Sequence, residues 1–256
     1  MNFLSKNLAI VNQKGGVGKS TTAVNLGAGL AELGNRVLIV DVDPQGNATS
    51  GLGVDKSSVE SSIYHVLIDD VKSSEAIIES ETENLFLLPA NIDLAGAEIE
   101  LVSMMSRETR LKSALSEERD NYDYILLDCP PSLGLLTLNA LSAADSIVVP
   151  IQCEYYALEG LGQLIETVNL VRNNLNKSLE IEGVVLTMYD GRTNLSQQVT
   201  EDVKEFFGEK VYETVIPRNV RLSEAPSFGK PITEYASNSR GAEKYRKLAK
   251  EVNNNV

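Results

Sequence analysis

The chain has 256 residues, of which 43% are hydrophobic and 23% are charged, and its formal net charge is −13. This composition is that of a globular protein and excludes wholesale disorder. No apolar run reaches the roughly 18 residues that a membrane span needs, and the first residues lack the pattern of a secretory signal. Two cysteines and one histidine make a disulfide framework, a His-rich metal centre and a Ser-His-Asp hydrolase improbable. We therefore expect a soluble, reduced, cytoplasmic protein, with Cys129 and Cys153 as buried small residues and His65 as an ordinary helix residue.

Short apolar runs alternate with helical patterns along the chain. In chain order, strands are expected at residues 8–12, 36–41, 85–89, 124–128, 146–151, 182–187 and 211–216. Helices are expected at residues 19–33, 97–115, 135–143, 158–175, 195–207 and 239–252. Runs such as VLIV, YILLD and IVVPI are apolar without alternation, as in strands that are buried on both faces. We therefore predict an α/β fold with a mostly parallel sheet flanked by helices on both faces. Since no linker divides the chain, a single domain is expected over residues 1–256.

A glycine-rich segment, KGGVGKST, joins the first predicted strand to the first predicted helix. Glycines allow backbone N–H groups to curl around an anion, and the amino end of a helix adds partial positive charge. Lys19 would neutralise the β- and γ-phosphates of a nucleotide, and the Ser20 hydroxyl would ligate Mg²⁺. A glycine-rich turn without a ligand is the alternative. The context favours a phosphate-binding loop made of Lys14, Gly15, Gly16, Val17, Gly18, Lys19, Ser20 and Thr21.

This loop departs from the usual pattern G-x-x-x-x-G-K-[ST], because Gln13 occupies the first position and an additional lysine, Lys14, precedes the glycines. In the form K-G-G-x-G-K-[ST], the sequence strongly resembles the deviant Walker A ATPases, and within them the ParA/Soj partition proteins, from about residue 6 to residue 250. The resemblance implies a P-loop NTPase fold, ATP and Mg²⁺ as cofactors, and a homodimer in the ATP state. It also implies that Lys14 acts beside Lys19 in catalysis by reaching the phosphates held by the partner. A solvated loop lysine is the alternative.

Three aspartates end two of the predicted strands. Asp41 and Asp43 lie two positions apart in RVLIVDVDPQGN and share a face of an extended chain, and Asp128 closes YDYILLD. A carboxylate that closes an apolar strand beside a phosphate loop is typical of a residue that holds a water on Mg²⁺, which predicts this role for Asp128. The resemblance implies that Asp43 positions the attacking water and contacts Mg²⁺ through water. Strand-end aspartates also start turns, and that interpretation is favoured for Asp41.

Nucleobase recognition is less clearly marked in the sequence. Loops at strand ends hold ligands in open α/β sheets. Two such loops are expected, one after each of the strands at 182–187 and 211–216. The resemblance implies adenine contacts near Met188 in the first loop and near Pro217, Arg218 and Asn219 in the second.

Positive charge gathers near the end of an otherwise acidic chain. Residues 1–128 hold 10 basic and 20 acidic side chains, whereas residues 210–250 hold nine basic and four acidic ones. The segments DGRTNL and PRNVRLSEAPSFGK resemble the partition ATPases, in which residues matching Arg192 and Arg221 support DNA binding without sequence preference. Lys230 and Arg240 are expected to extend this basic strip. For all four residues the alternative is a set of scattered, solvated charges.

The function favoured by the sequence is that of an ATPase whose ATP-bound dimer binds non-specific double-stranded DNA in chromosome or plasmid partitioning, with slow hydrolysis resetting it. The resemblance further implies a ParB-like centromere-binding protein as activator of hydrolysis, no membrane partner, and a nucleoid-associated location in the cytoplasm. The last residues, KYRKLAKEVNNNV, are too polar to anchor in lipid. Two alternatives stay open: a MinD-like or cargo-positioning ATPase of the same fold without DNA binding, and a nucleotide-gated transcriptional regulator.

Overall fold

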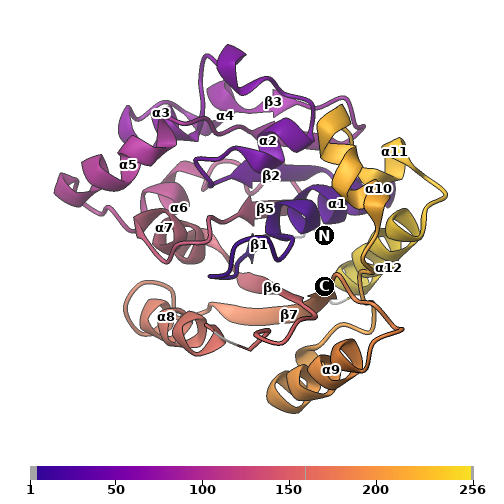
Figure 1. Ribbon diagram of the computed structural model, residues 1–256. Helices are drawn as coiled ribbons and strands as arrows, with labels where there is room; N and C mark the ends of the chain where they lie inside the picture. Colours follow the sequence, from indigo (N-terminus) through magenta and orange to yellow (C-terminus); the bar gives the residue numbers. More distant parts are fainter. Residues whose placement is uncertain (1–4, 159, 255–256) are drawn as a thin grey trace.

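A seven-stranded sheet in the order β3-β4-β2-β5-β1-β6-β7 runs through the computed structural model, which describes residues 5–158 and 160–254 (Figure 1). Its strands are β1 (Lys6–Ile10), β2 (Val37–Asp41), β3 (Ile78–Glu79), β4 (Leu85–Leu88), β5 (Tyr124–Asp128), β6 (Ser146–Gln152) and β7 (Glu180–Thr187). Every pairing is parallel except that of β3 with β4. The predicted α/β fold with a mostly parallel sheet is therefore confirmed. Residues 1–4 and 255–256 of the expected domain, and residue 159 in one expected helix, lie outside the described residues.

The central strands are apolar throughout because helices cover both faces of the sheet. All residues of β2 and β5 are buried, as their continuous apolar runs predict. Two separate hydrophobic clusters result, one on each face. Leu38 and Ile125 belong to the first cluster, whereas their neighbours Ile39 and Leu126 belong to the second, as the alternation of side chains along a strand requires.

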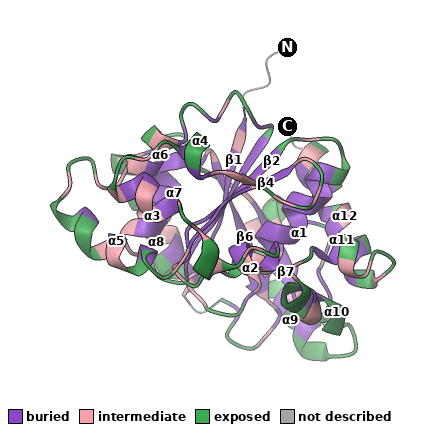
Figure 2. Cartoon of the chain, turned by 90° about the horizontal axis from the view of Figure 1, so that it is seen from above, coloured by how far each residue is buried: buried purple, intermediate pink, exposed green. Residues whose placement is uncertain are grey.

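The helices form two layers, one on each face of the sheet (Figure 1). One layer contains α1 (Lys19–Glu32), α2 (Asn47–Gly51), α10 (Val220–Glu224), α11 (Ile232–Tyr235) and α12 (Arg240–Asn254). The other contains α3 (Ile63–Ile68), α4 (Ser73–Ala76), α5 (Leu94–Glu100), α6 (Arg110–Ala114), α7 (Leu135–Ala143), α8 (Leu161–Asn174) and α9 (Asn194–Phe207). Four short 3₁₀ helices complete the described part: η1 (Lys56–Ser58), η2 (Leu101–Ser103), η3 (Gly208–Lys210) and η4 (Ala225–Phe228). Figure 2 shows buried strands between helices whose outer sides are exposed. Within residues 5–158 and 160–254, no helix is long and apolar enough to cross a membrane.

The segment 211–216 is not the strand that its β-branched residues predict. The N–H groups of Tyr212 and Ile216 donate to β7, but only isolated bridges join this part of the chain to the sheet. The backbone N–H of Glu213 and the hydroxyl of Thr214 donate instead to the carboxylate of Glu251 on α12. Glu251 thus holds the segment against a helix and leaves the ladder beside β7 incomplete.

The helix expected over residues 97–115 is also wrong, because the structure divides it into α5, η2 and α6. Met104 is extended, with ψ of +147°, and Ser106 has φ of +53°, in the left-handed region that interrupts a right-handed helix. The apolar residues at both ends of the expected helix are nevertheless core residues, since Leu101 and Leu111 are fully buried. The periodicity therefore identified the core-facing positions correctly but not the turn between them.

Candidate active site

The predicted phosphate loop connects β1 to α1. Gly16 and Gly18 have φ of +75° and +91°, a backbone conformation that residues with side chains rarely adopt. Gly15 does not share this requirement, and a Cβ atom built on it would meet no atom within 4 Å. The glycines at positions 16 and 18 therefore serve the conformation of the loop, whereas nothing in the described residues of the protomer requires glycine at position 15.

Two side chains from elsewhere in the fold hold the loop in place. Asn12 accepts a hydrogen bond from the Lys14 N–H at 2.9 Å and donates one to the Pro150 carbonyl of β6 at 2.7 Å. The hydroxyl of Thr187, at the end of β7, donates to the Val17 carbonyl at 2.8 Å. Sequence analysis missed both residues, and a contact such as Thr187 with Val17, which spans 170 positions, leaves no local pattern.

Lys19, the first residue of α1, lies inside the loop. Its side-chain nitrogen donates to the Lys14 carbonyl at 3.1 Å, and the residue is only 7% exposed. Burial lowers the pKa of Lys19, and the nearby Asp128 and Asp43 oppose this shift only in part. No carboxylate among the described residues lies within ion-pair distance of this ammonium group. A bound anion would supply the charge that the site lacks.

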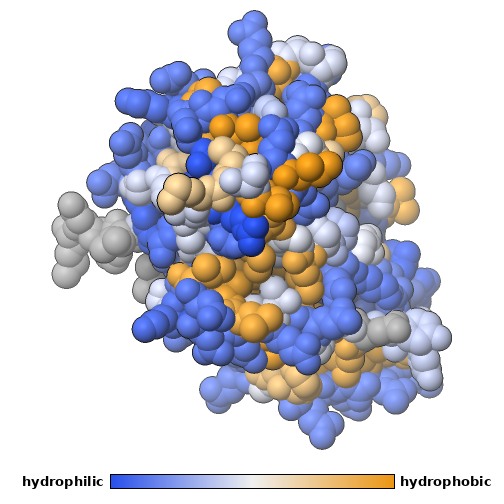
Figure 3. Space-filling model, turned by 90° about the vertical axis from the view of Figure 1, so that its left-hand side faces the viewer, coloured by the Kyte–Doolittle hydropathy of each residue, from blue (hydrophilic) through white to orange (hydrophobic). Residues whose placement is uncertain are grey.

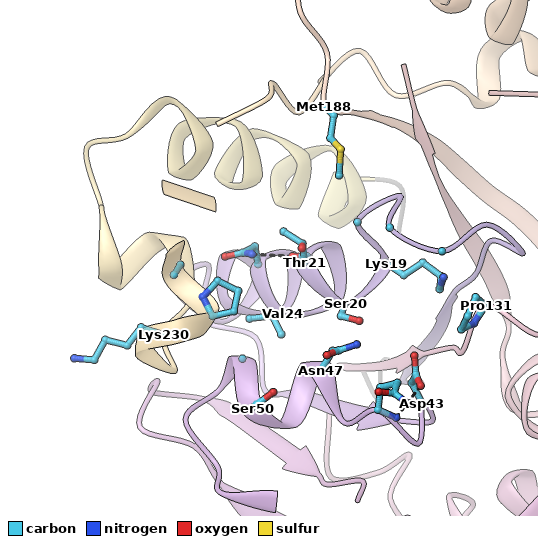
Figure 4. A pocket seen from close by; sticks show the side chains of 18 residues that line it. Lys19, Ser20, Thr21, Val24, Asp43, Asn47, Ser50, Pro131, Met188 and Lys230 are labelled. Carbon is cyan, nitrogen blue, oxygen red and sulfur yellow. Dashed lines mark hydrogen bonds between the residues drawn. The ribbon is translucent and has the colours of Figure 1, made fainter. Parts of the chain in front are cut away.

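A cavity of about 470 Å³ lies beside the loop, which is within the usual size range of small-molecule sites. Figure 4 shows Lys19, Ser20, Asp43 and Pro131 around one end of this cavity and Lys230 at the other. The groups suited to phosphate and metal are therefore gathered at one end. The residues lining the cavity are Gly15, Gly16, Gly18, Lys19, Ser20, Thr21, Val24, Asn25, Asp43, Gln45, Asn47, Ser50, Gly51, Pro131, Met188, Ala225, Pro226 and Lys230.

The two aspartates after β2 have different surroundings. Asp43 lines the cavity, and its Oδ1 atom accepts a hydrogen bond from the Gln45 N–H at 2.9 Å. Asp41 is fully buried and accepts hydrogen bonds from the N–H and hydroxyl of Thr49, at 2.8 and 2.7 Å. Burial raises the pKa of Asp41 to about 6. The contacts of Asp41 are those of a residue that fixes the turn from β2 into α2, whereas Asp43 faces the ligand space.

Asp128 ends β5 directly beside Asp41 in the sheet. It is fully buried, and neither of its carboxylate oxygens has a hydrogen-bond partner among the described residues. Burial, and then the neighbouring Asp41, raise the pKa of Asp128 well above its usual range, and the nearby Ser20 hydroxyl and Lys19 ammonium group oppose this shift only in part. An unpartnered buried carboxylate is costly. A magnesium ion with its waters fits this arrangement, because it would supply both positive charge and hydrogen-bond donors.

The two cysteines and the histidine have surroundings typical of residues with a structural role. Cys129 and Cys153 are buried, and burial raises the pKa of Cys129 strongly and that of Cys153 to about 11. Both thiols therefore stay protonated near neutral pH. The ring of His65 accepts a hydrogen bond from the Ser62 N–H at 3.1 Å, in a capping box at the start of α3.

The residues expected near adenine lie in two different places. Met188 lines the cavity, with φ of +50°. Pro217, Arg218 and Asn219 are not among the described residues that line it; Asn219 instead caps α10 by accepting from the Arg221 N–H at 2.8 Å. Ala225 and Pro226 of η4 also line the cavity, as does Lys230, which had been expected in the basic strip. The segment PRNVRLSEAPSFGK thus reaches the cavity, but through its second half.

Lys14 points away from the cavity that Lys19 faces. Its ammonium group forms an ion pair with Glu154, in the loop after β6. It lines a second cavity together with Gln13, Gly160, Gly162 and Gln163, and is not among the described residues that line the first. In this protomer Lys14 therefore does not act on the site formed by its own loop.

The loops that carry Arg192 and Arg218 lie side by side. The Tyr189 N–H donates to the Ile216 carbonyl at 3.0 Å, and the Arg218 N–H donates to the Tyr189 carbonyl at 3.1 Å. The Arg192 side chain is 89% exposed and pairs with Asp190 at 2.7 Å, which holds the pKa of Asp190 below its usual range.

Two further residues of the expected strip lie nearby in the chain. Arg221 is the second residue of α10, which follows the Arg218 loop, and it is exposed and pairs with Glu224 at 2.9 Å. Arg240 is exposed at the start of α12. Both arginines of the predicted DNA contact are thus exposed, and each already has a carboxylate partner within its own chain.

The loop between β1 and α1, the buried lysine and the aspartates at the strand ends define an ATP-binding P-loop ATPase. A family model described as an AAA domain matches residues 5–181. The sporulation initiation inhibitor protein Soj of Bacillus subtilis (strain 168) is 65% identical over 249 residues, which cover 97% of this chain and 98% of Soj. The chromosome partitioning protein ParA of Myxococcus xanthus is 54% identical, over 96% of this chain and 87% of that protein.

A solved structure shares the fold. Cobyrinic acid a,c-diamide synthase from Mycobacterium smegmatis, with bound ADP and magnesium, has a TM-score of 0.85 and 42% identity, over 96% of this chain and 93% of that one. The present chain belongs to the ParA/Soj family of chromosome-partitioning ATPases, within the ParA/MinD superfamily.

Proposed function

We propose that this chain hydrolyses ATP slowly with Mg²⁺, dimerises when ATP is bound, and in that state binds double-stranded DNA without sequence preference. A ParB-like centromere-binding protein stimulates hydrolysis, and the protein acts as one domain on the nucleoid in the cytoplasm. The observation that carries this proposal is the grouping of Lys19, Ser20 and Asp43 at one end of a single cavity, close to the unpartnered carboxylate of Asp128.

Each of these residues has a distinct task in phosphoryl transfer. The Lys19 ammonium group and the backbone N–H groups of the loop bind the β- and γ-phosphates at the amino end of α1. Ser20 and, through water, Asp128 would hold Mg²⁺, which would supply positive charge beside the phosphates. The Oδ1 atom of Asp43 accepts a hydrogen bond from the Gln45 N–H, which fixes the carboxylate. Its Oδ2 atom orients the attacking water. Met188, Ala225 and Pro226 enclose the far end of the cavity, where the adenine ring would lie.

The protomer leaves room for a second copy at the phosphate loop. Lys14 is held by Glu154 at a separate cavity, so it would have to change partners to contact phosphates across a dimer. Gly15 lines the nucleotide cavity and has open space beside its Cα atom. The open space at Gly15 supports a dimer in which two phosphate loops face each other, and in such a dimer Lys14 would exchange Glu154 for phosphate.

Replacing Gly15 by valine is expected to leave ATP affinity nearly unchanged but to prevent ATP-dependent dimerisation. A Cβ atom at position 15 meets no atom of the described protomer within 4 Å, whereas in a dimer the valine side chain would obstruct the close approach of the two loops. Sedimentation velocity with ATP and Mg²⁺ measures the dimer, and calorimetry measures the affinity.

A graded variant serves as the control for this prediction. Gly15→Ala adds one methyl group at the same open position and should weaken the dimer less than Gly15→Val. If Gly15→Val dimerises like the wild type, the facing-loop arrangement is wrong. If Gly15→Val loses ATP affinity, the substitution has damaged the phosphate loop within the protomer, and the prediction of unchanged affinity is wrong.

Arg192→Ala and Arg221→Ala are each expected to weaken DNA binding by the ATP-bound dimer without affecting dimerisation. Affinity for DNA falls with salt because each phosphate contact releases condensed counterions, with a slope of about −0.9 per contact. A variant that removes one contact from each protomer should therefore reduce the slope by about 1.8. Anisotropy with a labelled duplex over a salt series measures this slope.

Two further variants separate local contacts from overall charge. Lys177→Ala also removes one positive charge, but Lys177 lies just before β7, at the amino end of that strand, whereas the cavity lies at the carboxyl ends of the strands; this variant should leave the slope unchanged. Glu224→Gln frees Arg221 from its carboxylate partner and should raise DNA affinity at low salt. Wild-type slopes in both arginine variants would contradict DNA binding through these loops and would favour a cargo-positioning ATPase.

A further inference from the structure

The surface of α5 carries an apolar stripe that the fold does not use. The inner side of α5 and of η2, which follows it directly, is formed by Leu94, Ala97 and Leu101, which are fully buried in the core. A second series at helical spacing, Ile92, Ala95, Ile99 and Val102, occupies the opposite side and is exposed. We call this second series the α5 stripe. A surface helix needs only one apolar side, so the α5 stripe is not explained by folding.

The side chains of the α5 stripe are strongly exposed. The exposed fractions are 68% for Ile92, 78% for Ile99 and 57% for Val102, and Met105 just beyond η2 is 88% exposed. Figure 3 views the side of the molecule on which α5 lies and shows hydrophobic residues gathered on it among hydrophilic ones. Single exposed apolar residues are common, but several neighbouring ones typically mark an interaction site.

The charges along the α5 stripe are all negative. Asp93 and Glu100 lie along one border of the stripe and Glu98 along the other, by helical spacing, and residues 91–106 contain no lysine or arginine. The Oε1 atom of Glu98 is buried and has no hydrogen-bond partner among the described residues, so Asp93 and Glu100, which are both exposed, supply the accessible charge. Glu100 accepts a hydrogen bond from the Tyr64 hydroxyl at 3.1 Å, which fixes its carboxylate beside the stripe.

We propose that the α5 stripe is a docking surface for a basic amphipathic segment of another protein. Aliphatic side chains of that segment would cover Ile92, Ile99 and Val102, and its lysine or arginine side chains would pair with Asp93 and Glu100. The flexible Met105 side chain would adapt to the end of the segment. This proposal requires neither ATP hydrolysis nor DNA binding, so it stands apart from the proposed function.

The acidic borders argue against other occupants of the same surface. A second copy of the chain would bring its own acidic borders against these, and like charges facing each other oppose association. Nucleic acid and anionic lipid headgroups are repelled for the same reason. Positive charge on the partner is therefore as much a part of the proposal as its apolar side chains.

A synthetic peptide of leucine and lysine, arranged with helical amphipathic spacing, provides the probe. Its binding to the full-length chain is measured by fluorescence anisotropy, beside a scrambled peptide of the same composition. Ile99→Ser is expected to weaken binding about tenfold, as expected for a buried aliphatic contact. Asp93→Asn combined with Glu100→Gln should weaken it at low salt and reduce its salt dependence. Leu170→Ser is the matched control, because Leu170 is 63% exposed on α8 and lies outside the stripe.

The results decide the proposal in either direction. Stronger binding of the amphipathic peptide than of the scrambled one, lost in Ile99→Ser and kept in Leu170→Ser, supports it. Equal binding of the two peptides, or equal losses in the two variants, would show attraction to the net charge alone and overturn it. Sedimentation without peptide adds a further check: if Ile99→Ser abolishes self-association of the wild type, the occupant is a second copy and the proposal is wrong.

Discussion

Lys19→Ala is expected to lower ATP affinity by at least about a hundredfold, or about 2.7 kcal/mol. The lysine ammonium group is buried in the loop, and among the described residues its side chain makes one hydrogen bond, of 3.1 Å, to the Lys14 carbonyl. Hydrogen bonds to charged groups contribute about 1.5–3 kcal/mol each, and a phosphate chain would accept more than one from this group. Calorimetric titration with ATP and Mg²⁺ measures the loss.

Two comparisons make the lysine prediction specific. Lys230→Ala removes a lysine from the other end of the same cavity and should reduce affinity much less (Figure 4). Since burial lowers the pKa of Lys19, its charge disfavours the folded state, so without nucleotide Lys19→Ala should unfold at an unchanged or higher temperature. Unchanged ATP affinity in Lys19→Ala would remove the basis for the phosphate site.

The sequence predicts those parts of the fold whose conformation is determined by residues close to one another in the chain. The strands β2 and β5 are continuous apolar runs, and burial on both faces follows from that pattern alone. The segment 211–216 has the same β-branched character, but its conformation depends on Glu251, which lies on a different helix and takes two of its donors. A local sequence pattern cannot indicate that a residue on a distant helix will accept these hydrogen bonds.

The same distinction divides the candidate site. Lys19, Ser20 and Asp43 belong to short motifs whose chemistry is readable in the sequence, and the structure gathers them at one cavity. Lys230 and Pro226 close that cavity from a segment about two hundred positions later in the chain, where no motif indicates a nucleotide. The close approach of Gly229 to Gly53, which seats η4 beside α2, depends on two glycines that are unremarkable in sequence.

Asp43→Ala is expected to reduce ATP hydrolysis by about a hundredfold or more while leaving ATP affinity nearly unchanged. The Asp43 carboxylate is positioned by the Gln45 N–H and faces the cavity, yet it makes no ion pair with Lys19 that binding would depend on. Loss of this group leaves the attacking water without orientation, which affects the chemical step alone. Phosphate release measures the rate, and sedimentation should show the ATP-bound dimer accumulating.

Asp41→Asn provides the contrast to Asp43→Ala, because it changes a carboxylate two positions away on the same strand end. Asp41 accepts hydrogen bonds from Thr49 and from the Asp43 N–H, and an asparagine amide cannot accept all of them. This variant should therefore lower the thermal unfolding midpoint, whereas Asp43→Ala should not. If Asp43→Ala retained wild-type hydrolysis, or stayed as monomeric with ATP as Gly15→Val, the attacking water would have to be oriented by another group and the assignment of Asp43 would be wrong.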